Sequence, residues 1–232
     1  MKRFYKQASA LPGADGHRVV LDGKPIRTPA KAELVLPTAA LAELLAAEWE
    51  AQQDEIQPAD MPLTQIASTA IDHVSAQREG VIGEVVRYAE TDLLCYRAEE
   101  PAALAERQAQ MWQPLLDWAA EAFEAPLQVT AGIVPARQPE PALRGVRRAV
   151  EGLSDMELTA LATLTSACGS LIVALALHHG RITPAEAFDI AQLDETFQIE
   201  RWGEDDEATR RRALLRRDIE AAQRFLSHCR LS

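Results

Sequence analysis

Histidines and cysteines are the side chains of this 232-residue sequence that are best suited to catalysis or metal binding. His73 follows Asp72, and a carboxylate beside an imidazole can support a general base. His178 and His179 stand where a helix is expected to end, a position that favours histidine without any chemistry. The sequence has no glycine-rich phosphate loop and no nucleophile elbow. It therefore predicts no catalytic residue, no metal site and no cofactor. An enzyme of unrecognised type, with a small pocket near His73 and Cys95, stays open as an alternative.

The three cysteines and the net charge narrow the class of protein further. Cys95, Cys168 and Cys229 are odd in number, far apart and without metal-ligand spacing, so we expect small core residues in a reducing compartment. The formal net charge of −11 disfavours a nucleic-acid binder, because neutralising phosphates drives that affinity. It equally disfavours a polybasic membrane-surface protein. All four lysines lie within the first 31 residues, and the sequence alone assigns no function to that bias.

The segment from residue 193 to residue 205 carries the most informative polar pattern. On a helix, Asp194, Gln198 and Trp202 recur at i, i+4 and i+8 and share one face, with Glu195 beside them. An aromatic side chain ringed by polar groups is typical of a protein-recognition hot spot. The alternative is that Trp202 fills a gap where the helix breaks at Gly203. These residues alone leave both interpretations open.

The first 37 residues predict three short strands, over residues 18–21, 25–28 and 33–36. Asp22 and Gly23 separate the first two strands and favour a tight turn with positive φ angles. Three short strands need a cover. A helix that begins after Thr38 can supply it, and Trp49 lies on the apolar stripe of that helix. We therefore interpret Trp49, Asp22 and Gly23 as structural residues of a small α/β domain over residues 1–75.

From residue 76 onward the pattern predicts only helices, which form a larger bundle over residues 76–232. Capping boxes mark helix starts at Ser154 and Thr183. Residues 158–177 contain no formal charge, yet their many Thr, Ser, Gly and Ala residues predict one long central helix of the bundle rather than a membrane span. The basic run over residues 210–217 is flanked by acids and predicts a solvated helix face. The fold class is α+β.

The sequence resembles the F1 ATP synthase assembly chaperones dedicated to the alpha subunit, and the resemblance runs nearly end to end. The individual motifs are weak, but their order and spacing together are specific. The matching residues include Phe4-Tyr5-Lys6, Leu21 through Pro29, Glu48-Trp49 with Gln52, Met61 through Thr64, Thr69 through Asp72, Tyr88, Thr91 through Arg97, Gln108 with Trp112, Pro114 through Leu116, Trp118, Ser170 through Ile172, and residues 193–205.

This resemblance implies a non-enzymatic chaperone with a small N-terminal α/β domain and a C-terminal helical orthogonal bundle. Its partner would be the free alpha subunit of F1, protected from aggregation until it pairs with beta. The acidic segment associated with function in the family maps onto Glu195 and its neighbours, so we expect partner binding by Asp194, Glu195, Gln198, Trp202 and Glu204. The start at Phe4-Tyr5-Lys6 suggests a bacterial cytoplasmic member. A helical scaffold for another protein remains an alternative, because it differs only in its partner.

Overall fold

The computed structural model describes residues 1–132 and 136–230, and its contacts divide the chain into two compact units. The first unit comprises Met1–Arg78, Ser154–Ala160 and the chain from Ala221 onward. The second comprises Glu79–Leu153 and Leu161–Glu220. The structure thus confirms an α+β chain with an N-terminal antiparallel sheet followed by a mostly helical region. A division into domains at residues 75 and 76 stays a prediction.

A four-stranded antiparallel sheet opens the first unit. Its strands are ordered β1-β2-β3, and β4 pairs with the other end of β2. Asp22 and Gly23 have φ angles of 48° and 81° and form the two-residue turn between β2 and β3, as the sequence predicts. The bounds are β1 Ala8–Gly13, β2 Gly16–Leu21, β3 Lys24–Pro25 and β4 Val35–Leu36.

The strand predictions need correction in three places. The prediction omits β1, because its small residues, Pro12 and Gly13 have little β-propensity; the pairing with β2 makes it a strand. The predicted strand over residues 25–28 is observed as Lys24–Pro25, and the one over residues 33–36 as Val35–Leu36. The chain between them turns, and the Thr28 amide donates to the Ala32 carbonyl at 3.0 Å. Thr28 Oγ1 donates a 2.6 Å hydrogen bond to the Asp72 carboxylate, which ties this loop to a helical segment of the same unit.

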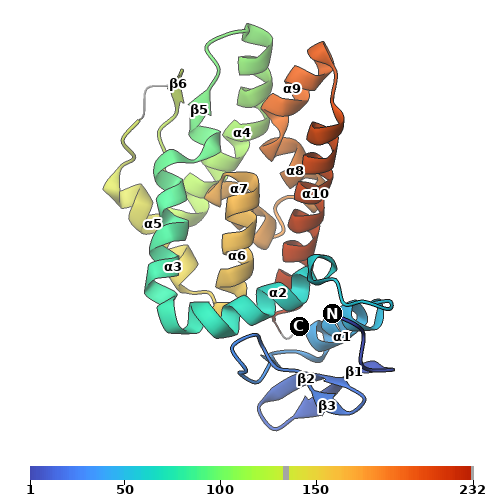
Figure 1. Ribbon diagram of the computed structural model, residues 1–232. Coiled ribbons are helices and arrows are strands. Elements are labelled where there is room, and N and C mark those ends of the chain that lie inside the picture. Colours follow the sequence, from blue (N-terminus) through green and yellow to red (C-terminus); the bar gives the residue numbers. More distant parts are fainter. Residues whose placement is uncertain (133–135, 231–232) are drawn as a thin grey trace. The chain divides into compact units, whose positions relative to one another are not determined.

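Helix α1 (Ala39–Glu50) lies against this sheet (Figure 1). Thr38 is its N-cap, and the Thr38 hydroxyl accepts a hydrogen bond from the Leu41 amide at 3.1 Å. Leu41 and Leu45 are fully buried, and Trp49 follows on the same stripe, half-buried with its ring edge-on to Tyr5. The sequence pattern therefore predicted this helix and its buried face correctly.

A nearly continuous helical run follows in the chain. It consists of η1 (Pro58–Asp60), α2 (Pro62–Thr69), the π-helical η2 (Ala70–Val74) and α3 (Ser75–Arg87). The Glu48 carboxylate accepts hydrogen bonds from the backbone amides of Leu63 and Thr64 at 2.8 and 2.9 Å, which satisfies the free N–H groups at the start of α2. The Asp72 carboxylate in η2 accepts hydrogen bonds from the Thr28 hydroxyl and from the Ala30 amide. Both of its oxygens are therefore already hydrogen-bonded within the fold.

The second unit is mainly helical, with one correction. Residues 96–97 and 130–131 form a short parallel strand pair, although the sequence analysis expected no strands beyond residue 76. Two-residue strands carry too little periodicity to be read from sequence. The elements are η3 (Tyr88–Thr91), η4 (Leu93–Cys95), β5 (Tyr96–Arg97), α4 (Ala102–Phe123), β6 (Thr130–Ala131), α5 (Glu140–Glu151), α6 (Asp155–Cys168), α7 (Leu171–His178), α8 (Pro184–Ala191), α9 (Leu193–Trp202) and α10 (Asp206–Leu226).

The predicted single helix over residues 158–177 is two helices, α6 and α7. Gly169 takes a φ of 63°, a left-handed conformation that ends α6. Ser170 then caps α7, because its hydroxyl accepts from the Val173 amide at 3.0 Å. The buried Asp92 carboxylate accepts from the Ser170 hydroxyl at 2.7 Å and reinforces this cap. Across the described residues, no helix combines the length and hydropathy that crossing a bilayer requires.

The helix starts predicted from capping boxes are confirmed. The Ser154 hydroxyl and the Glu157 carboxylate bond each other's backbone amides at the start of α6. Thr183 and Glu186 do the same at the start of α8. Because a capping box involves residues only three positions apart, it can be identified from the sequence without knowledge of the tertiary structure.

Candidate functional site

Helix α9 positions the polar residues that the sequence singled out. Its apolar side is buried in the second unit: Leu193 is 2% exposed and Phe197 is 5% exposed. Ile190, at the end of α8, continues this buried stripe, and its carbonyl accepts a hydrogen bond from the Trp112 indole at 3.1 Å. The opposite side of α9 is therefore left to the surface, as a 3.6-residue period requires.

Asp194 begins this surface but is partly turned inward. Its carboxylate accepts a 2.7 Å hydrogen bond from the side-chain amide of Gln108 on α4, a residue that is 1% exposed. The amide oxygen of Gln108 in turn accepts from the Ala98 amide at 2.7 Å. Asp194 thus links α9 to α4, because its carboxylate is hydrogen-bonded to the buried side-chain amide of Gln108.

Two ion pairs join the other acidic residues to α10. Glu195 pairs with Arg211 at 3.0 Å, and Glu204 pairs with Arg212 at 3.3 Å. Arg212 also donates to the Thr196 hydroxyl at 3.1 Å. The basic run over residues 210–217 therefore uses Arg211 and Arg212 to bind Glu195 and Glu204. Glu204 is one of the flanking acids that the sequence analysis noted, whereas the pairing with Glu195 on α9 was not expected.

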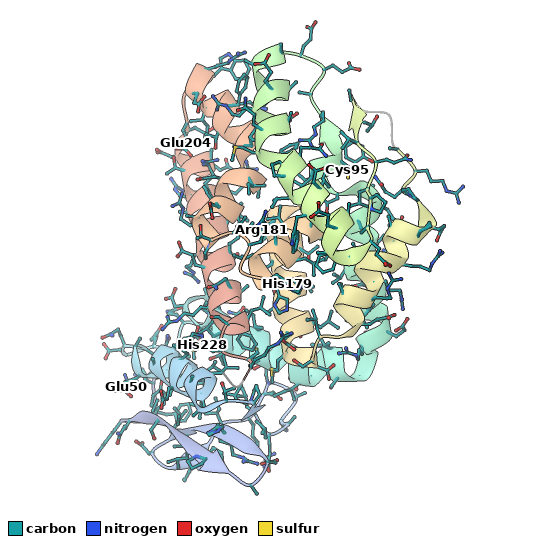
Figure 2. All side chains as sticks on the ribbon, turned by 180° about the vertical axis from the view of Figure 1, so that it is seen from behind. Glu50, Cys95, His179, Arg181, Glu204 and His228 are labelled. Carbon is teal, nitrogen blue, oxygen red and sulfur yellow. The ribbon has the colours of Figure 1, made fainter. Side chains whose placement is uncertain are left out.

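Trp202 and Gln198 are exposed beyond this ion-paired frame. Trp202 is 76% exposed, the largest exposed fraction among the large hydrophobic side chains described. Gly203 follows with a φ of 85° and ends α9, so the indole is presented at a helix terminus. A side chain this exposed fills no gap in the core, which contradicts the interpretation of Trp202 as a plug. Glu204 stands just beyond the break, before α10 begins (Figure 2).

Arginine side chains brace the same helix. Arg107 on α4 binds Glu200 at 2.9 Å, and its guanidinium lies 5.3 Å from the centre of the Phe197 ring. Arg201 lies over the same ring at 4.1 Å. The Arg107 contact joins α9 to α4 at the surface, beside the buried packing of Leu193 and Phe197. The single sequence had no signal for these pairings, since their members are up to 93 residues apart.

The candidate residues therefore divide into two groups. Asp194, Glu195 and Glu204 hold α9 and α10 in place while keeping carboxylate oxygens at the surface. Gln198 and Trp202 have no such internal role in the described structure. An exposed indole beside carboxylates offers apolar area together with hydrogen-bond acceptors, which suits a protein partner better than a small molecule.

The residues suggested for an enzyme lack the required properties. Cys95 is fully buried, and burial raises the pKa of its thiol to about 12, so the nucleophilic thiolate is suppressed. Figure 2 places Cys95 among the elements of the helical unit. Asp72, the neighbour of His73, is engaged by Thr28 and Ala30. Within residues 1–132 and 136–230, no group of three potential ligands is arranged to hold a metal ion.

Comparison with known proteins gives a consistent result. Residues 2–120 match the family model described as ATP12 chaperone protein. The curated protein "Protein atp12, mitochondrial" of Schizosaccharomyces pombe is 27% identical over 218 residues, which cover 87% of this chain and 74% of that protein.

Solved structures agree over almost the whole chain. Atp12 from Paracoccus denitrificans is 42% identical with a TM-score of 0.93, and the match covers 99% of this chain and 98% of that one. The Atu1473 protein from Agrobacterium tumefaciens is 41% identical with a TM-score of 0.95, covering 99% and 86%. The family is one of chaperones, which agrees with the prediction of a protein that is not an enzyme. The chain belongs to the ATP12 chaperone family.

Proposed function

We propose that this protein binds the free alpha subunit of F1 ATP synthase and prevents its aggregation until the subunit pairs with beta. The family supports an assembly chaperone of the ATP synthase. A subunit that belongs in a ring exposes the apolar surface that its neighbour will cover, and such a surface drives aggregation. A chaperone that covers it must also release it, so its contact should combine an apolar anchor with a polar rim.

The observation that carries this proposal is the 76% exposed Trp202 beside the carboxylates of α9 and the loop to α10. We assign the client-binding surface to Asp194, Glu195, Gln198, Trp202 and Glu204. Trp202 supplies the anchor, because an indole buries a large area at a small cost in side-chain entropy. The carboxylates and Gln198 supply acceptors and donors around it.

The location that we propose is the bacterial cytoplasm. The solved relatives from Paracoccus denitrificans and Agrobacterium tumefaciens are bacterial proteins. The three cysteines are free and buried, which suits a reducing compartment. An unassembled F1 subunit must be met before the ring closes, so the chaperone and its client would share this compartment.

The experiment is an aggregation assay of purified alpha subunit, followed by light scattering, with the wild type and two site variants. Glu195→Lys and Trp202→Ser should lose most of the protection. Both should keep the far-UV CD spectrum and melt within a few degrees of the wild type, because exposed ion pairs and exposed side chains contribute about 1 kcal/mol or less to stability.

Glu121→Lys is the matched control. Glu121 is an exposed residue of α4 that makes no ion pair with any described residue, and the substitution changes the net charge by the same amount. It should protect the client like the wild type. Equal protection by Glu195→Lys and Trp202→Ser would refute the assigned surface, and a wild type that protects no alpha subunit would refute the proposed function itself.

A further inference from the structure

A second surface with the features of a docking site lies in the first unit, where the turn between β2 and β3 meets the start of the chain and α1. We name it the aromatic pocket. Its volume is about 550 Å³, and it is separate in sequence from the α9 surface. It is lined by Met1, Phe4, Tyr5, Leu21, Asp22, Lys24, Pro25, Ile26, Arg27 and Trp49.

The apolar wall of this pocket is held in place. The Tyr5 hydroxyl donates a 2.6 Å hydrogen bond to the Trp49 carbonyl, and the two rings meet edge-on with centroids 5.8 Å apart. The Phe4 ring packs edge-on against Tyr5 at 5.4 Å. Tyr5 is 6% exposed, whereas Phe4 is 66% exposed. Aromatic side chains are enriched at the interfaces and hot spots of protein complexes, so this wall has the composition of a protein-binding surface.

The indole N–H of Trp49 is an unpaired donor on a residue that lines the pocket. This nitrogen is buried, and it donates a hydrogen bond to no acceptor among the described residues. A buried donor without an acceptor destabilises a protein, so nearly all such groups in native structures are paired. This nitrogen is shielded from solvent, so an acceptor brought by a partner reaches it only if the Trp49 ring turns toward the pocket.

The charges at the rim define the chemistry of that partner. Lys24 makes no ion pair within the described chain, and Arg27 donates only to the Lys31 carbonyl at 2.8 Å. The one acid in the lining, Asp22, is already bound by the backbone amides of Gln7 and Lys6 at 3.0 to 3.1 Å. The cations are therefore available to an incoming anion, while the carboxylate is engaged.

The N-terminal part of the sequence as a whole carries an excess of positive charge. Residues 1–31 carry seven Lys and Arg but only two Asp, a formal charge of +5, whereas the remaining residues sum to −16. Exposed charges beyond a Debye length of about 8 Å are largely screened at physiological salt. An anion at this pocket would therefore experience the nearby cations rather than the net charge of −11.

We propose that the aromatic pocket is a second docking site for the client, and that its occupant is a segment of the alpha subunit that carries an Asp or Glu within two residues of an apolar side chain. The apolar side chain packs on Phe4 and Trp49, and the carboxylate faces Lys24 and Arg27. This inference rests on the proposed function for the identity of the client, but its site and its chemistry come from the first unit alone.

The first test is an array of overlapping 15-residue peptides that span the alpha subunit, probed with the full-length wild type and with Lys24→Glu and Phe4→Ala variants. The wild type should bind peptides that combine an acid with an adjacent apolar residue. Each variant should bind them at least about tenfold more weakly. Raising the salt concentration should weaken binding by the wild type and leave residual binding by Lys24→Glu nearly unchanged.

Arg87→Glu is the control, because Arg87 is exposed on α3 in the second unit, outside the pocket, and the substitution makes the same change in charge. It should bind the peptides like the wild type. Equal binding by the wild type and Lys24→Glu would overturn the assigned site. A wild type that binds no peptide, or binds without regard to acidic residues, would overturn the assigned occupant.

The aggregation assay separates failure of this inference from failure of the proposed function. The decisive protein is the double variant Lys24→Glu/Phe4→Ala. If the wild type protects the alpha subunit and this double variant protects it equally well, the second site is refuted while the proposed function stands. If the wild type protects nothing, the proposed function fails, and the peptide array then decides alone whether the pocket binds acidic segments. We expect the double variant to lose at least about threefold in protection when the chaperone is present at a limiting concentration.

Discussion

Asp92 provides a sharp test of the energetics of the second unit. Its side chain is fully buried and accepts hydrogen bonds from the Ser170 hydroxyl at 2.7 Å and from the amides of Leu94 and Ile172 at 3.1 and 3.2 Å. Burial raises the pKa of this carboxyl from its ordinary value of 3.8 to about 6, although these hydrogen bonds favour the ionised form. The perturbation that we choose is Asp92→Asn.

The expected effect follows from linkage between proton binding and folding. The folded protein binds the Asp92 proton more tightly than the unfolded chain, so this group adds stability below pH 3.8 that is lost as the pH rises through about 6. At about 1.36 kcal/mol per pH unit, the full contribution is about 3 kcal/mol. Between pH 7.5 and pH 4.5, about 2 kcal/mol of it should appear.

The assay is urea unfolding of the wild type and Asp92→Asn at a series of pH values from 4.5 to 7.5. All other titrating groups are common to both proteins, so the difference between their free energies of unfolding isolates Asp92. That difference should move by about 2 kcal/mol in favour of the wild type as the pH falls to 4.5. A flat difference, or a shift of opposite sign, would show that the hydrogen bonds outweigh burial. The carboxyl carbon chemical shift of Asp92 should titrate near pH 6 in the wild type.

Three further predictions concern stability, each checked by urea unfolding. Thr38→Ala removes the acceptor for the Leu41 amide at the start of α1 and should cost about 1 kcal/mol; a loss below the error of the measurement would deny the cap its role. Gly16→Ala should destabilise by at least about 1 kcal/mol, because Gly16 has a φ of 144° and an added Cβ would lie 2.6 Å from the Leu36 carbonyl oxygen. Gly80→Ala should instead stabilise by about 0.5 to 1 kcal/mol, since Gly80 lies within α3 and an added Cβ would meet nothing within 4 Å; equal effects of the two glycine substitutions would contradict this contrast.

The sequence predicted those parts of the fold that depend on neighbouring residues. The caps at Thr38, Ser154 and Thr183 and the Asp22–Gly23 turn are decided within four residues, and all appear in the structure. The sequence missed β1, because its strand conformation comes from pairing with β2 rather than from its own composition. It also missed the break at Gly169, where a left-handed residue and the Ser170 cap divide a run of small and apolar residues that carries no formal charge.

The candidate site shows the same limit. The helical period placed Gln198 and Trp202 on one side of α9, and both are exposed there. The inward hydrogen bond from Gln108 to Asp194 joins residues 86 positions apart, and the ion pair between Glu195 and Arg211 joins separate helices. A single sequence records which residues are polar but not which of them meet across the tertiary structure.

The most direct test of the central claim is a pull-down of the tagged chain from its own cell lysate, with and without added F1 beta subunit. The account predicts that alpha subunit alone is recovered and that it is released when beta is added, because beta covers the surface that the chaperone protects. A Trp202→Ser chain should recover little alpha subunit. Recovery of no alpha subunit, or of alpha and beta together as assembled F1, would contradict the claim that this protein holds the free subunit before assembly.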